Sequence, residues 1–266
     1  MKPVLKWAGG KTSLIPQLMK HFPKSFDRYF EPFLGGGAVF LALNDQKKSV
    51  INDFNTEITN LYEMIRDEPR ELMRELDRLG ERYSEKFYYE LRAAKPKSHL
   101  KKAARTLFLN KTCFNGLYRQ NSRGEFNVPF GKRARLPKLY ESSQFLELSK
   151  RLKKTKLLNL DFEEVIDLAG PGDFIYCDPP YEPLSLTSSF NSYMSRGFNK
   201  KDQIRLLEAS ERAVSRGARV AISNSSAPFV KKLFRNWELV TIVSRRSINS
   251  KGDRRGLVEE ILAKSY

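Results

Sequence analysis

The sequence has few cysteines and histidines for its length, and this scarcity excludes several kinds of site. Its 266 residues include two cysteines, Cys113 and Cys177, and two histidines, His21 and His99. Because the cysteines are far apart and form no metal-spaced pairs, neither a disulfide framework nor a metal site is expected, and a reducing, cytoplasmic location is favoured. Neither histidine lies in a motif, which argues against catalysis by a histidine base.

Long apolar runs are also lacking. No segment approaches the roughly 20 apolar residues that a membrane-spanning helix needs. The most apolar stretch, 29–43, is interrupted by Glu31, Pro32 and three glycines. We therefore expect a folded protein with no membrane segment and no secretory signal.

Acidic residues are outnumbered by basic ones. Lys and Arg number 48 against 31 Asp and Glu, which gives a net charge of +17. A surplus of this size favours a polyanionic partner. The basic residues cluster at 95–105, 132–138 and 245–255, and we expect these stretches to face phosphates. The alternative is a lysine-rich surface that only keeps the protein soluble.

Strand and helix patterns alternate along the chain, with an interruption in the middle. Residues 1–56 and 141–266 show the alternating pattern, whereas 57–140 is predominantly helical, with periodic segments at 57–79, 82–94 and 100–109. The last two expected strands, 238–245 and 258–263, could form a hairpin. We predict an α/β fold with a doubly wound, mostly parallel sheet. A helical lobe is inserted at 57–140 and carries a polar, aromatic hairpin at about 113–131.

A glycine-rich turn follows the first expected strand. The segment FEPFLGGGA spans residues 30–38, and Asp53 ends the next expected strand. Glycines let a ligand approach the backbone closely, and an acid at this place can hold ribose hydroxyls. The pattern indicates a nucleoside-containing cofactor, although a structural tight turn would look the same. The spacing is not that of a dinucleotide or nucleoside triphosphate site.

The motif DPPY, Asp178 to Tyr181, follows the apolar segment FIYC. Its prolines, Pro179 and Pro180, fix a rigid turn at a strand end. The Asp178 carboxylate and the Pro179 carbonyl could accept both hydrogens of an adenine amino group, which would free the nitrogen lone pair. Tyr181 could stack on the flipped base. The alternative is a rigid turn with a surface acid.

Two further segments are weaker when taken alone. In KWAGGK, residues 6–11, Trp7 could line a cofactor pocket and Lys11 could neutralise a carboxylate, but a tryptophan can simply belong to the core. In the 113–131 segment an arginine can pair with guanine and an aromatic side chain can fill an unstacked gap. An ordinary β-hairpin with Phe114 and Leu117 buried is the alternative.

Taken in order, KWAGGK, EPFLGGGAVF, NDFN, NGLYR with GEFNVPFG, and DPPY resemble the DNA adenine methyltransferase (Dam) family over nearly the whole chain. The resemblance implies a methyltransferase sheet and methyl transfer from S-adenosylmethionine to adenine N6 in double-stranded DNA, with GATC as the target. Residues 1–56 and 141–266 would form the catalytic domain, and 57–140 the target-recognition domain. The alternatives are a cytosine-N4 methyltransferase, which usually carries serine at the Asp178 position, a catalytically silent DNA-binding protein, and an enzyme acting on RNA.

The resemblance also implies roles for individual residues. Asp178, Pro179, Pro180 and Tyr181 match the catalytic tetrapeptide. Trp7, Lys11, Asp53 and Asp178 match positions that contact the cofactor, and we add Phe33, Gly35, Gly37 and Asp161 to the predicted cofactor site. The predicted DNA-binding residues are Lys6, Phe114, Asn115, Leu117, Arg119, Pro129 and Arg133. In one departure, residues 132–133 are Lys-Arg where relatives often carry arginine then tyrosine. A restriction endonuclease of the same system is a further partner that the family suggests.

Overall fold

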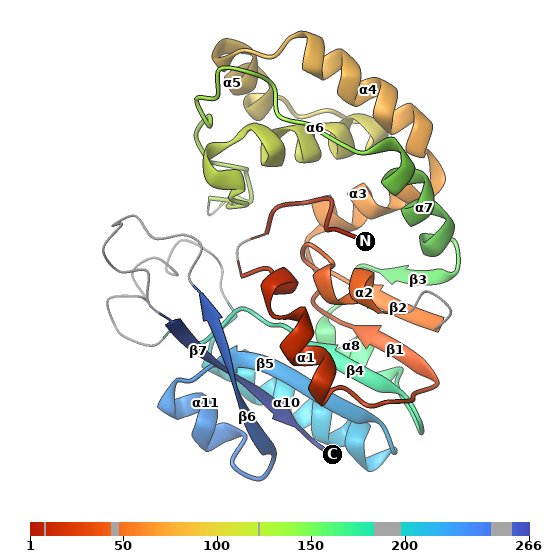
Figure 1. The fold of residues 1–266 in the computed structure, drawn as a ribbon, viewed down its shortest axis with the longest axis vertical. Helices are drawn as coiled ribbons and strands as arrows, with labels where there is room; N and C mark the ends of the chain where they lie inside the picture. The colour runs from red at the N-terminus through yellow and green to blue at the C-terminus, as the bar shows by residue number, and fades with distance from the viewer. Residues whose placement is uncertain (8, 44–47, 122, 184–197, 246–256) are drawn as a thin grey trace. The chain divides into compact units, whose positions relative to one another are not determined.

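The computed structural model describes residues 1–7, 9–43, 48–121, 123–183, 198–245 and 257–266. The chain divides into two compact units, and both contain helices and strands (Figure 1). Unit 1 comprises Met1–Gly10 and Leu34–Leu160, and unit 2 comprises Lys11–Phe33 and Asp161–Tyr266. The separate target-recognition domain at 57–140 stays a prediction.

Unit 1 contains a parallel strand pair and a group of helices. Strand β2 (Lys48–Asn52) pairs in parallel with β3 (Thr155–Leu158). The helices are α2 (Ala38–Ala42), α3 (Thr56–Asp67), α4 (Pro69–Glu81), α5 (Glu85–Ala93), α6 (His99–Thr112) and α7 (Ser142–Leu152). On α4 the buried residues are Leu72 and Leu76, one helical turn apart, so a narrow apolar stripe faces the core while the charged face meets solvent.

The periodic segment at 57–79 is helical, as predicted, but it forms two helices. Helix α3 ends at Asp67 and α4 begins at Pro69. Proline disfavours helical geometry in the residue before it, and Glu68 has φ −129° and ψ 49°. Because proline is tolerated in the first turn of a helix, a new helix starts directly after the break.

The 113–131 segment of unit 1 is less regular than the predicted hairpin. It begins with the short 3₁₀ helix η2 (Phe114–Gly116), and two isolated antiparallel bridges, Cys113 to Phe130 and Gln120 to Phe126, close the segment. Its apolar residues pack with residues of α5 and α6 in a small core. The buried members of this core are Tyr88, Leu109, Cys113, Phe126, Val128 and Phe130. The segment is therefore a loop held by side-chain packing more than by a strand ladder.

The described part of unit 2 contains five paired strands, and the DPPY motif follows one of them. In order of pairing they are β1 (Arg28–Glu31), β4 (Phe174–Cys177), β5 (Arg219–Ser225), β7 (Leu257–Lys264) and β6 (Glu238–Arg245). The pairs β1–β4 and β4–β5 are parallel, whereas β5–β7 and β6–β7 are antiparallel. The helical elements are η1 (Lys11–Ser13), α1 (Ile15–His21), α8 (Phe162–Asp167), α10 (Lys200–Ser215) and α11 (Pro228–Leu233).

These pairings confirm the predicted α/β class and the mostly parallel strands. All four residues of β4 are buried, as expected for a parallel strand covered on both faces. The predicted pairing of the last two strands is also confirmed, because β6 and β7 pair along their whole length. Helices α7 and α8 had not been predicted. Helix α8 is only six residues long, and its sequence signal is a capping box at Asp161 and Glu164.

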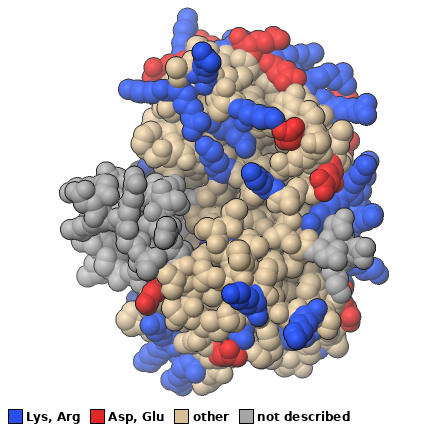
Figure 2. Space-filling model, in the orientation of Figure 1, with Lys and Arg blue, Asp and Glu red and all other residues tan. Residues whose placement is uncertain are grey.

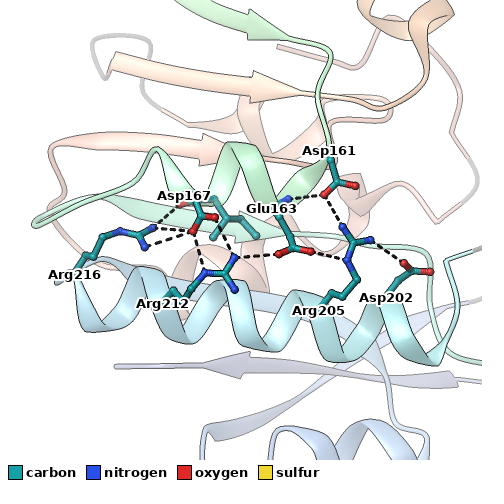
Figure 3. A network of polar contacts seen from close by, with 8 residues as sticks. Asp161, Glu163, Asp167, Asp202, Arg205, Arg212 and Arg216 are labelled. Atoms are coloured by element: carbon teal, nitrogen blue, oxygen red, sulfur yellow. Dashed lines mark hydrogen bonds and ion pairs between the residues drawn. The ribbon is translucent and has the colours of Figure 1, made fainter.

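Helices α8 and α10 are joined by a network of ion pairs (Figure 3). Its members are Asp161, Glu163, Asp167, Asp202, Arg205, Arg212 and Arg216. Arg205 contacts three of these carboxylates, since its guanidinium is 3.1 Å from Asp161, 2.5 Å from Glu163 and 3.0 Å from Asp202. The network fixes α8, and with it the start of that helix at Asp161.

Candidate functional site

The DPPY motif begins directly after β4, at the carboxyl end of this strand. In parallel sheets this is the edge at which ligands usually bind. The Asp178 side chain is 21% exposed, and its Oδ1 lies 2.9 Å from Nζ of the buried Lys11. Burial raises the pKa of Asp178 above its usual value, and the ammonium of Lys11 opposes this rise. The structure therefore brings together two residues, predicted separately, as a largely buried ion pair.

The Tyr181 phenol has a defined orientation in the same cluster. Its hydroxyl donates a hydrogen bond to Oε2 of Glu260, 2.7 Å away, and Lys11 Nζ lies 4.8 Å from the ring centroid. Burial raises the pKa of Tyr181 well above 10, and the carboxylates of Asp178 and Glu260 raise it further. The phenol is therefore protonated and donates to Glu260 at neutral pH.

The backbone of the DPPY motif is fixed by an amide pair from α10 and β5. Gln203 Nε2 donates to the Pro180 carbonyl at 3.1 Å, and Asn224 Nδ2 donates to Gln203 Oε1 at 2.9 Å. Asn224 also accepts from the backbone N–H of Glu182, at 3.3 Å. Both amide side chains are buried, where unpaired polar groups would be costly. Sequence reasoning missed this pair; the signal was an asparagine within the apolar strand pattern of residues 219–225.

Asp53 lies directly after β2 in unit 1, as predicted. Its Oδ2 accepts from the Gly35 backbone N–H at 2.8 Å, and its Oδ1 accepts from that of Asn55 at 2.9 Å. Burial raises the pKa of Asp53, and the two backbone hydrogen bonds oppose this rise. The carboxylate is thus held against the glycine turn in one orientation.

Trp7 packs directly on the glycine turn. Gly35 has φ +48°, and a Cβ there would lie 2.6 Å from Trp7 Nε1. Gly37 has φ +68°, and its Cβ would lie 2.7 Å from the Tyr62 hydroxyl. Both positions therefore need glycine because of backbone conformation and because a protein side chain approaches closely. Contact of these glycines with a cofactor stays a prediction.

Phe54 is a candidate that sequence reasoning missed. It follows Asp53 and is 79% exposed, which is unusual for so large an apolar side chain. An exposed aromatic next to an oriented carboxylate offers a flat face to an aromatic ligand. The signal was an aromatic residue inside the polar NDFN segment.

The other two predicted cofactor residues lie in unit 2. Phe33 stacks on Phe162, with ring centroids 5.4 Å apart. The Asp161 carboxylate caps α8 by accepting from the Glu163 backbone N–H at 3.0 Å, and it also pairs with Arg205. Asp161 therefore has a structural role of its own, and its contact with a cofactor stays a prediction.

In the 113–131 segment the predicted DNA-binding side chains are accessible. Phe114 is 51% exposed, so the alternative that it is buried is wrong. The neighbouring Asn115 has φ 53°, which turns the chain at this point. Arg119 is exposed, and its Nε donates to Asn127 Oδ1 at 2.8 Å. Leu117 is partly buried against the small core of the segment.

Of the other predicted DNA-binding residues, Pro129 lies in the same segment, Lys6 packs against it, and Arg133 follows it in the chain. The Lys6 side chain packs on Gly116, and the Lys6 backbone forms two hydrogen bonds of 2.8 Å with the side chain of Asn110. The Pro129 carbonyl accepts from the Phe114 backbone N–H at 2.9 Å. The Arg133 carbonyl accepts from the Tyr83 hydroxyl at 2.9 Å, while the residue itself is exposed.

Basic side chains are widespread on the helical part of unit 1, on the face that Figure 2 shows. One expectation is corrected: Arg105 does not face outward for phosphates. It is 8% exposed and donates to the carbonyls of Leu91 and Arg92. The guanidinium of Arg105 thus caps the end of α5 and serves the fold. The basic stretch at 245–255 lies outside the described residues beyond Arg245.

The fold is α/β with an acidic motif at the carboxyl end of a parallel strand, and sequence comparison identifies the family. The family model of D12 class N6 adenine-specific DNA methyltransferases matches residues 7–248, so the chain belongs to this family. It is an adenine-specific DNA methyltransferase by this membership. None of the helices among the described residues is long and apolar enough to cross a membrane.

Similar proteins cover the whole chain. The chain is 38% identical over 274 residues to the type II methyltransferase M1.LlaDCHI of Lactococcus lactis, covering 100% of this chain and 96% of that protein. It is 39% identical over 288 residues to the type II methyltransferase M.MjaIII of Methanocaldococcus jannaschii, covering 100% and 99%. It is 34% identical over 264 residues to the DNA adenine methylase of Escherichia coli, covering 97% and 93%. The similarity thus includes both units.

Proposed function

We propose that this chain transfers the methyl group of S-adenosylmethionine to the N6 amino group of adenine within GATC in double-stranded DNA. The observation that carries the proposal is the placement of Asp178 to Tyr181 after β4. There Asp178 is paired with Lys11 at 2.9 Å and the Tyr181 phenol is held by Glu260 at 2.7 Å. Membership of the D12 class supports adenine as the base.

The residues of unit 1 fit the nucleoside part of this cofactor. Asp53 is oriented by two backbone N–H groups. Since an ionised carboxylate offers about four lone-pair sites, it has capacity left for the two ribose hydroxyls. The exposed ring of Phe54 can stack on an adenine. Trp7, Gly35 and Gly37 belong to the same proposed site. When bound, S-adenosylmethionine supplies a methyl group on a positively charged sulfur.

The same proposal assigns residues of unit 2 to the cofactor. The Lys11 ammonium can neutralise a carboxylate of the cofactor while it stays close to Asp178. Phe33 contributes an aromatic face that Phe162 supports from one side. The Asp161 carboxylate caps α8 and pairs with Arg205 through Oδ1, and it would accept a hydrogen bond from the cofactor with its remaining lone pairs.

The proposed methyl transfer depends on two hydrogen-bond acceptors for the adenine amino group and on the burial of Asp178. Gln203 occupies the Pro180 carbonyl, so Asp178 and the Pro179 carbonyl are the acceptors proposed for the two amino hydrogens of adenine. Accepting both hydrogens makes the nitrogen lone pair more available for the methyl group. Asp178 is also the nearest proposed acceptor for the proton that the nitrogen loses, and burial raises the pKa of this carboxyl in the direction that favours protonation. Positioning would supply most of the rate.

The proposed target site is read by the 113–131 segment. The exposed Phe114 can fill the gap that a flipped adenine leaves in the base stack. Arg119 can pair with guanine through its guanidinium, and Leu117, Asn115 and Lys6 contribute contacts beside it. Pro129 and Arg133 complete the proposed DNA surface. A cytoplasmic location and a companion restriction endonuclease are part of the same proposal.

The proposal is tested by producing the chain in a host that lacks DNA methylation and sequencing the modified bases of its DNA. N6-methyladenine at GATC is expected. N6-methyladenine at another sequence would contradict the GATC assignment, and N4-methylcytosine would contradict the choice of base. No modified base, with cofactor still bound by the purified protein, would indicate a silent enzyme or an RNA substrate.

Asp178→Ala is the matching variant. It is expected to abolish methylation, because one of the two acceptors for the amino hydrogens is lost, while DNA binding in a gel-shift assay stays within about twofold of the wild type, since phosphate contacts dominate affinity. Methylation by this variant at a rate near that of the wild type would overturn the assignment of Asp178 as a catalytic residue.

A further inference from the structure

Glu260 is an acidic residue that faces the DPPY motif from another strand. It lies on β7, opposite Ser225 of β5 and Ile242 of β6. Its side chain is 16% exposed, and its Oε2 lies 2.7 Å from the Tyr181 hydroxyl and 3.9 Å from Lys11 Nζ. Nothing in the proposed chemistry has so far used this carboxylate.

Two carboxylates approach the ammonium of Lys11 in this cluster. Among the described contacts, Asp178 lies 2.9 Å and Glu260 lies 3.9 Å from Lys11 Nζ. Placing a second carboxylate beside the first raises the energy of both, and burial adds to this cost. A glutamine could accept the Tyr181 hydrogen bond without that cost. The acceptor for Tyr181 could therefore be neutral, and a charge at Glu260 has reasons other than this hydrogen bond being made.

The geometry offers two reasons. A hydrogen bond from a hydroxyl to a carboxylate is shorter and stronger than one to a neutral oxygen, so it holds the Tyr181 ring in a narrower range of orientations. In addition, an adenine amino nitrogen gains positive charge as it is methylated. A fixed negative charge nearby stabilises that developing charge without reorganisation.

We propose that Glu260 is a positioning residue for methyl transfer, which holds the Tyr181 phenol through its hydroxyl and adds a fixed negative charge to the Lys11–Asp178 pair. This rests on the proposed function of Asp178 to Tyr181. Glu260 acts through Tyr181 and Lys11, the two groups that its carboxylate contacts. The proposal predicts an effect on the chemical step with little effect on binding.

The test compares Glu260→Gln with Glu259→Gln in the full-length protein. Glu259 is the exposed neighbour on the same strand, so the control makes the same chemical change outside the cluster. Single-turnover methylation of a GATC duplex is expected to slow by about 10- to 100-fold in Glu260→Gln, because the hydrogen bond from Tyr181 becomes weaker and the fixed charge is lost. Glu259→Gln is expected to match the wild type. The Kd values for S-adenosylmethionine and DNA should change less than about threefold in both variants, since positioning acts on the transition state.

A double variant tests whether Glu260 acts through the phenol. Tyr181→Phe removes the hydroxyl donor, and Glu260→Gln weakens the acceptor. Because both changes act on the same hydrogen bond, the combined loss of rate should be smaller than the product of the two single losses. Multiplicative losses would overturn the claim that Glu260 acts through Tyr181.

The pH dependence separates positioning from simple loss of structure. The titratable groups that interact with Asp178 are Lys11, Glu260, Tyr181, Tyr176 and Cys177. The Glu260 carboxylate raises the pKa of Asp178, so its removal should move the acid limb of the rate profile to lower pH. If Glu260→Gln lowers the maximal rate but leaves the acid limb of the pH–rate profile at the same pH, the claim that Glu260 acts through its charge is contradicted.

Different results would overturn the proposed function and the proposed role of Glu260. If the wild type methylates no adenine, or if Asp178→Ala retains its activity, the proposed function fails. If the wild type is active, Asp178→Ala is inactive and Glu260→Gln is as fast as Glu259→Gln, the positioning role of Glu260 alone is overturned.

Discussion

Trp7 stacks on Tyr118, with ring centroids 5.1 Å apart and an angle of 29° between the rings. Trp7 covers the glycine turn at Gly35, and Tyr118 lies between the two residues proposed to read bases, Leu117 and Arg119. The proposed cofactor-binding and base-reading segments of unit 1 are thus in direct contact.

The Tyr118 hydroxyl reinforces this contact. It donates to Glu57 Oε2 at 2.8 Å and accepts from Asn55 Nδ2 at 3.1 Å. The hydroxyl also accepts from Gln120 Nε2 at 3.2 Å, so Tyr118→Phe keeps the stack on Trp7 but removes all three hydrogen bonds. We expect the free energy of unfolding to fall by about 1–2 kcal/mol, because partly buried polar groups lose their partner. Urea denaturation measures this change.

Tyr140→Phe is the control for this prediction. The Tyr140 hydroxyl donates to the carboxylate of Asp77 at 2.8 Å, at an exposed position away from the stack. Its removal should change the free energy of unfolding by less than about 0.5 kcal/mol. An equal decrease in the free energy of unfolding in the two variants would show that the hydrogen bonds of the Tyr118 hydroxyl stabilise the fold no more than an exposed hydrogen bond does.

The α8–α10 network gives a second prediction, on stability and salt. Arg205 contacts three carboxylates and lies over the Phe162 ring, 4.9 Å from its centroid. Its side chain is 41% exposed, so solvent screens these contacts. We expect Arg205→Met to lower the free energy of unfolding by roughly 1 kcal/mol at low salt and by less in 1 M NaCl, where the Debye length is about 3 Å.

Arg74→Met is the control for the network. Arg74 makes a single exposed pair with Glu71 on α4. Thermal or chemical unfolding of this variant should match the wild type at both salt concentrations, because an isolated exposed pair contributes little. A salt-independent loss in Arg205→Met would point to lost packing on Phe162 instead of lost ion pairs.

The sequence predicted those parts of the site that are continuous in the chain. Asp178 to Tyr181 follow one strand, and Asp53 follows another, so strand periodicity alone places both at strand ends. Glu260 could not be predicted, because its approach to Tyr181 depends on β7 pairing with β5 in the register that sets Ser225 opposite Glu260. Pairing register between distant strands is fixed by burial on both faces, which no local pattern shows.

Helix boundaries show the same limit on a smaller scale. The periodicity of residues 57–79 is real, but a proline at position 69 divides it into α3 and α4. The role of Arg105 was misjudged because its neighbours in the sequence are basic. Its guanidinium instead satisfies carbonyl groups at the end of α5, a need that appears only when α5 and α6 are packed.

Arg119 carries a third prediction, on target choice. Its guanidinium is exposed and oriented by Asn127 at 2.8 Å. A bidentate contact with guanine contributes about 1–3 kcal/mol of discrimination. We therefore expect Arg119→Ala to reduce the preference for GATC over sites with one changed base by about 10- to 100-fold, measured as a ratio of kcat/KM values.

Arg123→Ala is the control for target choice, since Arg123 is an exposed residue of the same segment. It should weaken methylation of all sites alike and make binding less dependent on salt, as the loss of a phosphate contact does. If Arg119→Ala keeps the full preference for GATC, or if both variants lose it equally, Arg119 is not a base-reading residue.

The pKa of Asp53 supplies the last prediction. Burial raises it above 3.8, so the folded protein binds this proton more tightly than the unfolded chain. Protonated Asp53 therefore stabilises the folded state. This stabilisation is fully present below about pH 3.8 and is lost as the pH rises through the pKa of Asp53 in the folded protein. Asp53→Asn should remove that decline with pH. Its amide can accept only one of the two backbone N–H groups that Asp53 accepts, so its free energy of unfolding at pH 7 should fall by about 1–2 kcal/mol, and cofactor affinity should fall as well. Asp67→Asn is the opposite case, because Arg66 lowers the pKa of Asp67. Asp67→Asn should therefore lose a little stability at pH 7. Identical curves of stability against pH for the wild type and Asp53→Asn would refute the raised pKa of Asp53.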